Sequence, residues 1–142
     1  MPSRSQLRAW LPVLAWAGLI FFLSTGRFTG ENTGAFLLPF LAALFPNATQ
    51  HQIRVAHATV RKLAHFTEYL VLSLLLYRAL RAGQRSRFAA ACSAVAFAGA
   101  YAISDELHQM IVPGRTAAAA DCLIDVSGAA AGQGLLAALD RG

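Results

Sequence analysis

Long apolar runs alternate with short polar stretches along this chain, and the runs predict its helices. A helix needs about 20 apolar residues to cross a bilayer, and four runs approach or exceed that length. We predict membrane spans at about residues 7–24, 63–80, 88–110 and 117–139. The pattern thus predicts an all-α fold, an integral membrane four-helix bundle that forms a single domain over residues 1–142.

The segment between the first two predicted spans, at about 36–62, has a different pattern. A polar, glycine-rich loop is expected before it, at 26–34. Residues 36–46 are apolar but are interrupted by Pro39 and closed by Pro46, and about ten residues cannot cross the bilayer as a helix. The following residues mix cations with apolar side chains and predict an interfacial helix that leads into the second span. The whole segment is therefore expected to be interfacial or re-entrant.

Composition narrows the class of protein further. The chain is 56% hydrophobic and 13% charged, whereas a soluble domain is about one-quarter charged. Its formal net charge is +5, but the arginines lie between apolar runs and no basic, aromatic-rich face is present. We therefore expect no nucleic-acid partner, and we expect the cations to face anionic headgroups of a lipid bilayer. Cys92 and Cys122 lie inside apolar runs and are expected to be small buried residues.

The distribution of arginines predicts the orientation of the spans. Residues 78–87, between the second and third spans, carry four arginines and no acid, so the positive-inside rule places this loop in the cytoplasm. With four spans, both termini are then cytoplasmic. The first span also has the outline of a secretory signal peptide. Because residues 24–26 match a cleavage site poorly, we expect this helix to be retained.

Acidic and polar side chains collect where the predicted spans meet one face of the membrane. They lie at the start of the second span, the end of the third and the start of the fourth, and antiparallel packing brings these ends together. The residues are His65, Glu68, Asp105, Glu106, Gln109, Asp121 and Asp125. The Pro113-Gly114 breaker predicts a tight turn between the last two spans. Charged residues inside spans are functional candidates by default, although Arg61, Lys62 and Arg115 could instead neutralise the acids in a structural clamp.

Glycines in the fourth span predict close helix packing. Gly128, Gly132 and Gly134 have no side chain, so another helix can approach closely along this part of the span. The Gly128-x-x-x-Gly132 spacing is by itself a weak signal, because it arises easily by chance in so apolar a sequence.

Four short motifs follow one another between Arg61 and Gly134. They are Lys62-x-x-His65-Phe66-x-x-Tyr69, Asp105-Glu106-x-x-Gln109, Pro113-Gly114-Arg115, and Asp121 with a trailing Gly128. In these motifs the chain resembles the VanZ-like family of small bacterial membrane proteins, which is named for a teicoplanin-resistance accessory protein. Two positions depart from the family pattern: Arg61 stands where an acid is common, and Asp125 stands where an amide is usual. The resemblance implies a multi-pass protein of the bacterial cytoplasmic membrane with a role in the cell envelope.

The first function that fits these residues is that of a binding or accessory protein. The resemblance implies a role related to the cell wall or to glycopeptide resistance, with a lipid-linked cell-wall intermediate, a glycopeptide or a protein partner bound at the outer face. Arg115 suits a phosphate or carboxylate group of such a ligand. The candidate ligand-binding residues are Lys62, His65, Tyr69, Gln109, Arg115 and Asp125. The oligomeric state stays open.

Two other functions stay open as alternatives. A membrane enzyme would act on a lipid-linked or phosphate-bearing substrate, with His65 or Glu68 as general base. Carboxylates with one imidazole also suit magnesium, manganese or zinc, so such an enzyme could use a divalent metal. The candidates for both catalysis and metal binding are His65, Glu68, Asp105, Glu106 and Asp121. A proton- or ion-coupled carrier is the other alternative, although four spans are few for one without dimerisation.

Overall fold

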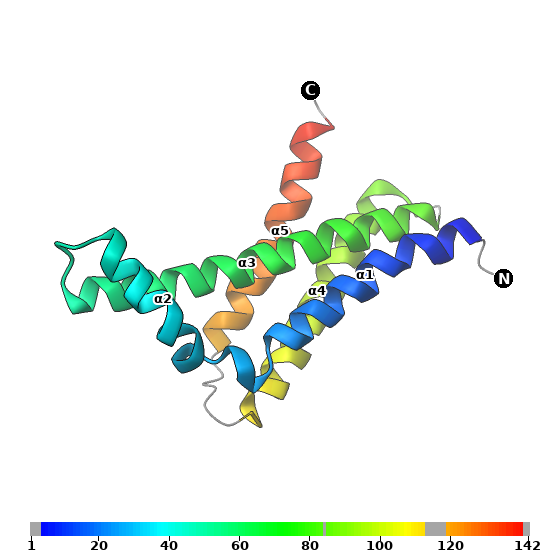
Figure 1. Ribbon diagram of the computed structural model, residues 1–142. Coiled ribbons are helices and arrows are strands. Elements are labelled where there is room, and N and C mark those ends of the chain that lie inside the picture. Colours follow the sequence, from blue (N-terminus) through cyan, green and yellow to red (C-terminus); the bar gives the residue numbers. More distant parts are fainter. Residues whose placement is uncertain (1–3, 84, 113–118, 141–142) are drawn as a thin grey trace.

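The computed structural model describes residues 4–83, 85–112 and 119–140, which form five α-helices, one short 3₁₀ helix and no strand. The elements are α1 (Arg4–Leu23), η1 (Gly26–Phe28), α2 (Gly30–Leu44), α3 (Gln50–Ala82), α4 (Arg87–Met110) and α5 (Ala119–Leu139), shown in Figure 1. The predicted all-α fold is confirmed. Four of the helices, α1, α3, α4 and α5, are long and apolar enough to cross a membrane, in agreement with the four predicted spans.

α3 is one helix of 33 residues, in which the predicted interfacial helix and the predicted span at 63–80 are continuous. The change from charged to apolar residues does not interrupt the backbone, because residues 50–82 contain neither proline nor glycine. Thr49 and Gln52 start the helix with a capping box. At 1.5 Å per residue, α3 is ~50 Å long and exceeds the ~30 Å hydrocarbon core of a bilayer.

α2 begins at Gly30, so the predicted loop at 26–34 is wrong in its second half. The helix starts there because the Thr29 hydroxyl caps it and accepts a hydrogen bond from the Asn32 backbone N–H (3.2 Å). α2 packs back along the first part of α3 as a helical hairpin. A contact of 3.3 Å between Thr33 Oγ1 and His57 Nε2 joins its two helices.

The connection between α3 and α4 is shorter than the predicted arginine loop at 78–87. Arg78 and Arg81 lie in the last turns of α3, which ends at Ala82, and α4 begins at Arg87. The Ser86 hydroxyl caps α4 by accepting a hydrogen bond from the Ala89 backbone N–H (3.2 Å). Three of the four arginines, at 78, 81 and 87, are therefore held on helix ends, and Arg85 lies in the connection between them.

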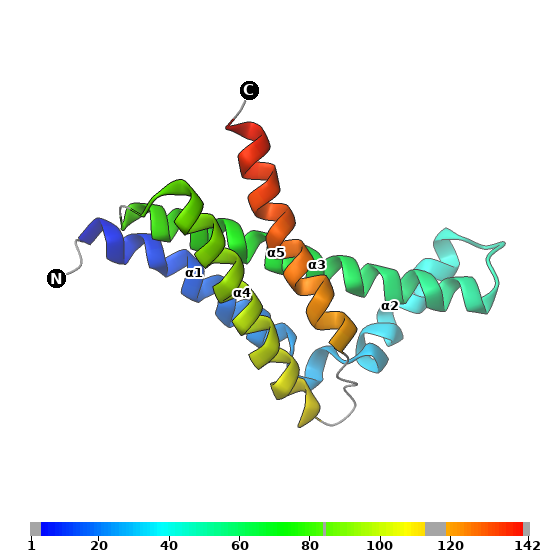
Figure 2. The same ribbon diagram turned by 180° about the vertical axis from the view of Figure 1, so that it is seen from behind.

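α3 is the central helix and packs against α1, α2, α4 and α5, as the two opposite views show (Figures 1 and 2). α4 faces it with a stripe of alanines, at 90, 94, 98 and 102, which are all 0% exposed. Their four-residue spacing keeps them on one side of the helix, and their small size lets α4 approach closely. On α3 the matching core residues are Tyr69, Leu72 and Leu76.

α5 crosses α3 at its glycines, which confirms the predicted close packing for two of the three. A Cβ atom at Gly128 would lie under 3.0 Å from the carbonyl oxygen of Phe66, and one at Gly132 would lie 2.9 Å from that of Leu70. Gly134 is different, because a Cβ atom there would meet open space. The α3–α5 crossing therefore depends on Gly128 and Gly132.

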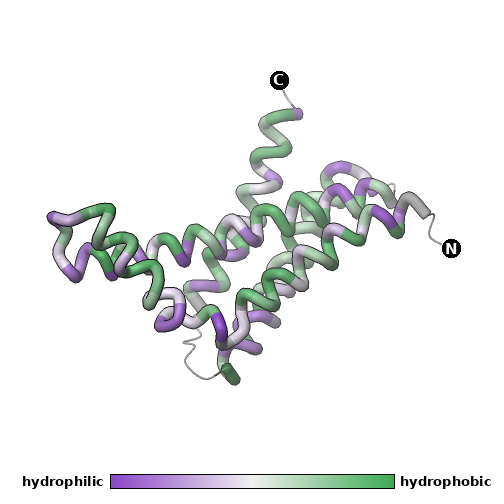
Figure 3. Tube along the Cα trace, in the orientation of Figure 1, coloured by the Kyte–Doolittle hydropathy of each residue, from purple (hydrophilic) through white to green (hydrophobic). Residues whose placement is uncertain are grey.

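α1 is tied to its neighbours by side chains that donate to backbone carbonyls. Trp16 Nε1 donates to the Glu68 carbonyl of α3 (2.9 Å). From α4, the Tyr101 hydroxyl donates to the Ala17 carbonyl (2.7 Å). α1 is hydrophilic near its N-terminal end and apolar along the rest of its length (Figure 3), as expected for a span.

The two cysteines are free thiols. Cys122 is half-buried, but Cys92 is exposed on α4, so the expectation that both are buried is wrong for Cys92. Cys92 occupies an outward-facing position of a helix whose opposite side carries the alanine stripe.

Candidate functional site

A cavity of about 240 Å³ lies where the C-terminal end of α1, η1 and the start of α2 meet α3 and α4. Its polar lining comes from α2, α3, α4 and the turn that follows α1. These polar residues are Ser24, Thr33, Arg61, His65, Glu68 and Asp105. Its apolar lining consists of Ile20, Leu23, Phe28 and Ala64. The cavity therefore brings both signs of charge next to a hydrocarbon wall.

The register of α3 places three charged or titratable side chains in the cavity. Arg61, His65 and Glu68 follow one another at intervals of four and three residues, which puts them on one side of a helix. The same side continues into the buried core at Tyr69 and Leu72. The residues of α3 that line the cavity therefore continue the buried side of this helix toward its N-terminus.

The alanine stripe of α4 ends in two buried polar residues. Asp105 and Gln109, which are 4% and 5% exposed, continue the register of Ala102. Gln109 Nε2 donates to Asp105 Oδ2 at 2.9 Å. Asp105 Oδ1 and the Tyr69 hydroxyl are also buried, and neither has a hydrogen-bond partner among the described residues. Burial of polar atoms without partners is costly, so a bound group that donates to Asp105 would be stabilised.

α5 contributes Asp125, which is 2% exposed and pairs with His65. Asp125 Oδ1 lies 3.5 Å from His65 Nδ1, which is within ion-pair range but longer than a usual hydrogen bond. The pair exists because Gly128, one turn further along α5, rests on the carbonyl of Phe66, the neighbour of His65. Helix packing thus places a buried carboxylate behind the cavity-lining imidazole.

The structure brings together only part of the predicted site. His65, Glu68 and Asp105 line the cavity, and the remaining predicted residues on described segments do not. Gln109, Tyr69 and Asp125 lie behind its wall, where Gln109 contacts Asp105 and Asp125 contacts His65. The functional roles of these residues stay predictions.

Four predicted residues fall elsewhere. Lys62 is exposed, and Glu106 is half-buried and close enough to Cys122 of α5 to interact electrostatically. Asp121 is half-buried and within electrostatic range of Asp125. Arg115 and the predicted Pro113-Gly114 turn lie outside the described residues.

The described residues contain no group of three or more His, Cys, Asp or Glu side chains that could hold a metal ion. His65, Glu68 and Asp105 share the cavity, but Glu106 and Asp121 do not line it. Metal binding by the predicted set stays a prediction.

Arg61, Ser24 and Thr33 were not among the predicted site residues. For Arg61 the signal was its position four residues before His65, on the same helix side. Its guanidinium also lies against Gly30, where a Cβ atom would collide with it. Ser24 and Thr33 reach the cavity only because the end of α1 and the start of α2 fold over α3, and no sequence spacing reports that packing.

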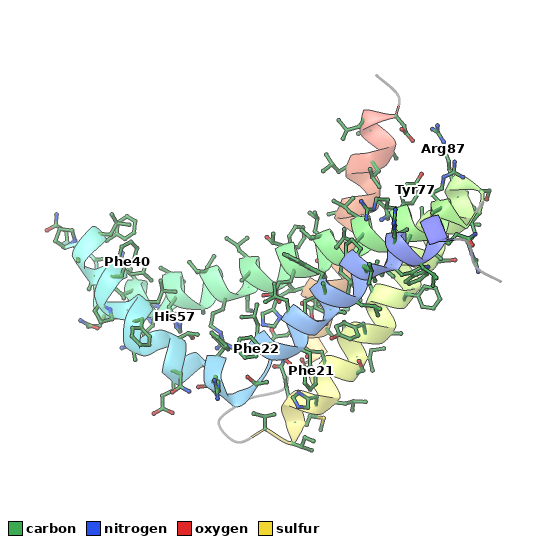
Figure 4. All side chains as sticks on the ribbon, turned by 45° about the vertical axis from the view of Figure 1, so that its right-hand side comes forward. Phe21, Phe22, Phe40, His57, Tyr77 and Arg87 are labelled. Atoms are coloured by element: carbon green, nitrogen blue, oxygen red, sulfur yellow. The ribbon has the colours of Figure 1, made fainter. Side chains whose placement is uncertain are left out.

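Aromatic contacts flank the cavity at the end of α1. Phe28, which lines it, meets Phe22 edge to face with ring centroids 5.4 Å apart. Phe21 meets His108 of α4 with centroids 4.8 Å apart. Figure 4 shows Phe21 and Phe22 at this end of α1, with His57 further along toward the α2–α3 hairpin.

The fold and the cavity define a class: a multi-pass α-helical membrane protein with charged side chains in a partly open cavity between its helices. A model of the VanZ/LLP1 family matches residues 9–140. The chain therefore belongs to the VanZ-like family, and the match covers nearly the whole chain. Neither a search of curated proteins nor a search of solved structures gave a match.

Proposed function

We propose that this VanZ-like protein is an accessory protein of the bacterial cell envelope that binds the anionic head of an amphiphilic ligand in its cavity. The observation that carries the proposal is that Arg61 and a hydrocarbon wall line the same cavity. Arg61 supplies a cation that suits phosphate or carboxylate, and Ile20 and Leu23 supply the apolar surface. A lipid-linked cell-wall intermediate has both kinds of group.

Arg61 is the residue that would hold the anion. Its planar guanidinium can bind phosphate or carboxylate oxygens with two parallel hydrogen bonds. The side chain is half-buried beneath Gly30 of α2, and partial removal from water strengthens its charge interactions. His65, one turn further along α3, can donate a second hydrogen bond to the same group when it is protonated.

The carboxylates of the cavity suit the neutral polar groups of such a head. Asp105 has one oxygen without a protein partner in the described part of the chain, and this oxygen can accept a hydrogen bond from a hydroxyl or amide N–H. Glu68 lines the same space. An anionic group that is joined to hydroxyls or amides therefore matches the lining better than a simple anion does.

The size of the cavity favours one ligand class over another. At about 240 Å³ it is smaller than the ~300–1,000 Å³ of pockets that enclose drug-sized molecules. A phosphate with part of a sugar would fit, whereas a whole glycopeptide would not. We therefore favour a lipid-linked intermediate as the ligand. By the positive-inside rule, the arginine-rich opposite end lies in the cytoplasm, and the cavity then lies toward the outer face.

Native mass spectrometry of the purified protein tests this proposal. The probes are a polyprenyl phosphate and the corresponding polyprenol, which differ only in the phosphate. We expect the wild type to retain the phosphate form preferentially. Arg61→Gln should weaken that binding roughly 10- to 100-fold, because a hydrogen bond to a charged group contributes about 1.5–3 kcal/mol.

Arg54→Gln is the matched control. Arg54 lies seven residues before Arg61 on α3, on the same side of the helix, but it is exposed and does not line the cavity. This variant should bind the phosphate form like the wild type. Equal retention of the two probes by the wild type, or equal loss in both variants, would contradict the proposal.

The His65–Asp125 pair favours a membrane enzyme as the second candidate. A carboxylate at Nδ1 fixes the orientation of an imidazole and leaves Nε2 available to take a proton from an attacking water. In a polyprenyl diphosphate the water would attack the terminal phosphorus and break the P–O–P bond, which gives inorganic phosphate and polyprenyl phosphate. With a polyprenyl diphosphate as probe, we would expect release of inorganic phosphate to fall about 100-fold or more in His65→Gln. No release above the protein-free rate would rule out this hydrolysis.

A further inference from the structure

A second cavity, of about 350 Å³, lies at the opposite end of the bundle from the first, between α3, α4 and α5. Its walls include Tyr77 of α3, Arg87 and Ala91 of α4, Leu136 and Ala137 of α5, and Asp140 directly after α5. In Figure 4, Tyr77 and Arg87 lie between the C-terminal part of α5 and the adjoining ends of α3 and α4. The first cavity shares none of these residues.

This groove exists because α5 diverges from α3 after their crossing. Among the described residues, the last side-chain hydrogen bonds between α3 and α5 are made by Gln133, whose Nε2 donates to Ser73 Oγ (2.6 Å) and to the Ser73 carbonyl (3.0 Å). Beyond it, α5 turns away from α3 and α4 (Figures 1 and 2). Leu136, which is half-buried, and Ala137, which is exposed, line the groove on the α5 side. In a membrane this apolar wedge needs an apolar occupant.

The mouth of the groove is positively charged. The arginines at 78, 81, 85 and 87 are all exposed at this end. Arg87 Nη1 lies 2.8 Å from Asp140 Oδ2, and both side chains are at least half exposed. Within the described part of the chain, no other carboxylate is within ion-pair distance of these arginines. Of these four arginines, Arg87 lines the groove, and the other three lie at the same end of the bundle without lining it. The groove therefore combines apolar walls with one cation, at an end of the bundle that is rich in arginine.

We propose that this groove binds one anionic phospholipid. Its phosphate would lie against Arg87, and an acyl chain would fill the wedge along Ala91, Leu136 and Ala137. The Arg87–Asp140 pair does not prevent this, because an exposed ion pair contributes only about 0–1 kcal/mol. The site is independent of the function proposed above, since it lies at the other end of the bundle.

Charge variants test the headgroup assignment. Native mass spectrometry would compare binding of phosphatidylglycerol with that of zwitterionic phosphatidylcholine to the full-length protein. Arg87→Gln should weaken phosphatidylglycerol binding about fivefold, the loss expected for one cation near an anionic lipid. Asp140→Asn should strengthen it, because Asp140 competes with the phosphate for Arg87. An unchanged Arg87→Gln, or a weakened Asp140→Asn, would overturn the proposal.

Shape variants test whether an acyl chain occupies the groove. Ala137 lines the groove, and the neighbouring Ala138 is also exposed but does not line it. Ala137→Phe should reduce phosphatidylglycerol binding severalfold, and Ala138→Phe should leave it unchanged. Inorganic phosphate should not displace the lipid, because it cannot fill the apolar walls. Equal effects of the two phenylalanines, or displacement by phosphate alone, would contradict the lipid assignment.

Discussion

The α3–α5 crossing can be tested by adding one methyl group at each of three glycines of α5. At Gly128 a Cβ atom would come under 3.0 Å from the Phe66 carbonyl oxygen, closer than real Cβ atoms come. That oxygen belongs to the α3 backbone, which cannot swing aside like a side chain. At Gly132 the nearest atom, the Leu70 carbonyl oxygen, is at 2.9 Å, against at least 3.4 Å for ordinary contact. At Gly134 the added atom would meet nothing within 4 Å.

These distances predict a graded series of stabilities. Overpacking of a close contact costs typically about 1–3 kcal/mol, whereas alanine in place of glycine favours a helix by about 1 kcal/mol. We therefore expect Gly128→Ala to destabilise the protein most, by roughly 2 kcal/mol net. Gly132→Ala should destabilise it less, because a shift of a few tenths of an ångström relieves most of the contact. Gly134→Ala should be neutral or stabilising.

The measurement is reversible unfolding of the purified protein in detergent, followed by circular dichroism. Gly134→Ala is the matched control, since it makes the same chemical change on the same helix without a neighbour. Separation of the helices at Gly128 should also disturb the adjoining His65–Asp125 pair. If Gly128→Ala and Gly134→Ala are equally stable, the proposed crossing and the position of Asp125 are both wrong.

Two further predictions concern the tie between α1 and α4 and the orientation of the bundle. Tyr101→Phe should lower the free energy of unfolding by about 1 kcal/mol, because it removes the hydrogen bond to the Ala17 carbonyl. The same change at Tyr77, whose hydroxyl has no hydrogen-bond partner among the described residues, serves as control, and equal losses would contradict the reasoning. Gly83→Cys, in a background without Cys92 and Cys122, should resist an impermeant maleimide in intact cells and react after lysis. Labelling of intact cells would place the arginine-rich end outside.

The spans were predictable because the apolar runs end close to residues that end or cap a helix. The run at 88–110 matches α4 closely, since Gly83 ends the preceding helix and Ser86 caps the next one. α3 was harder, because its charged first part and apolar second part differ in hydropathy while no residue between them breaks a helix. Hydropathy reports the surroundings of a residue, and backbone continuity depends on proline, glycine and capping residues.

The cavity was predictable in part, for a similar reason. Asp105 lines the cavity and Glu106 does not, because Asp105 and Gln109 lie on the same side of α4 as Ala102 and the rest of the alanine stripe. Adjacent residues on a helix point about 100° apart, so charge clustering alone could not separate the two acids. The approach of the α1 end and of α2 to α3 depends on tertiary packing, and so Ser24 and Thr33 could not be found from spacing.

A density map of the protein with a bound polyprenyl phosphate would test most directly whether Arg61 holds the anionic head of the ligand. We expect density for the phosphate within hydrogen-bond distance of the Arg61 guanidinium, with the first part of the prenyl chain against Ile20 and Leu23. The map of Arg61→Gln under the same conditions should lack that density while the helices stay in place. A phosphate bound away from Arg61, or density that persists in the variant, would contradict the claim.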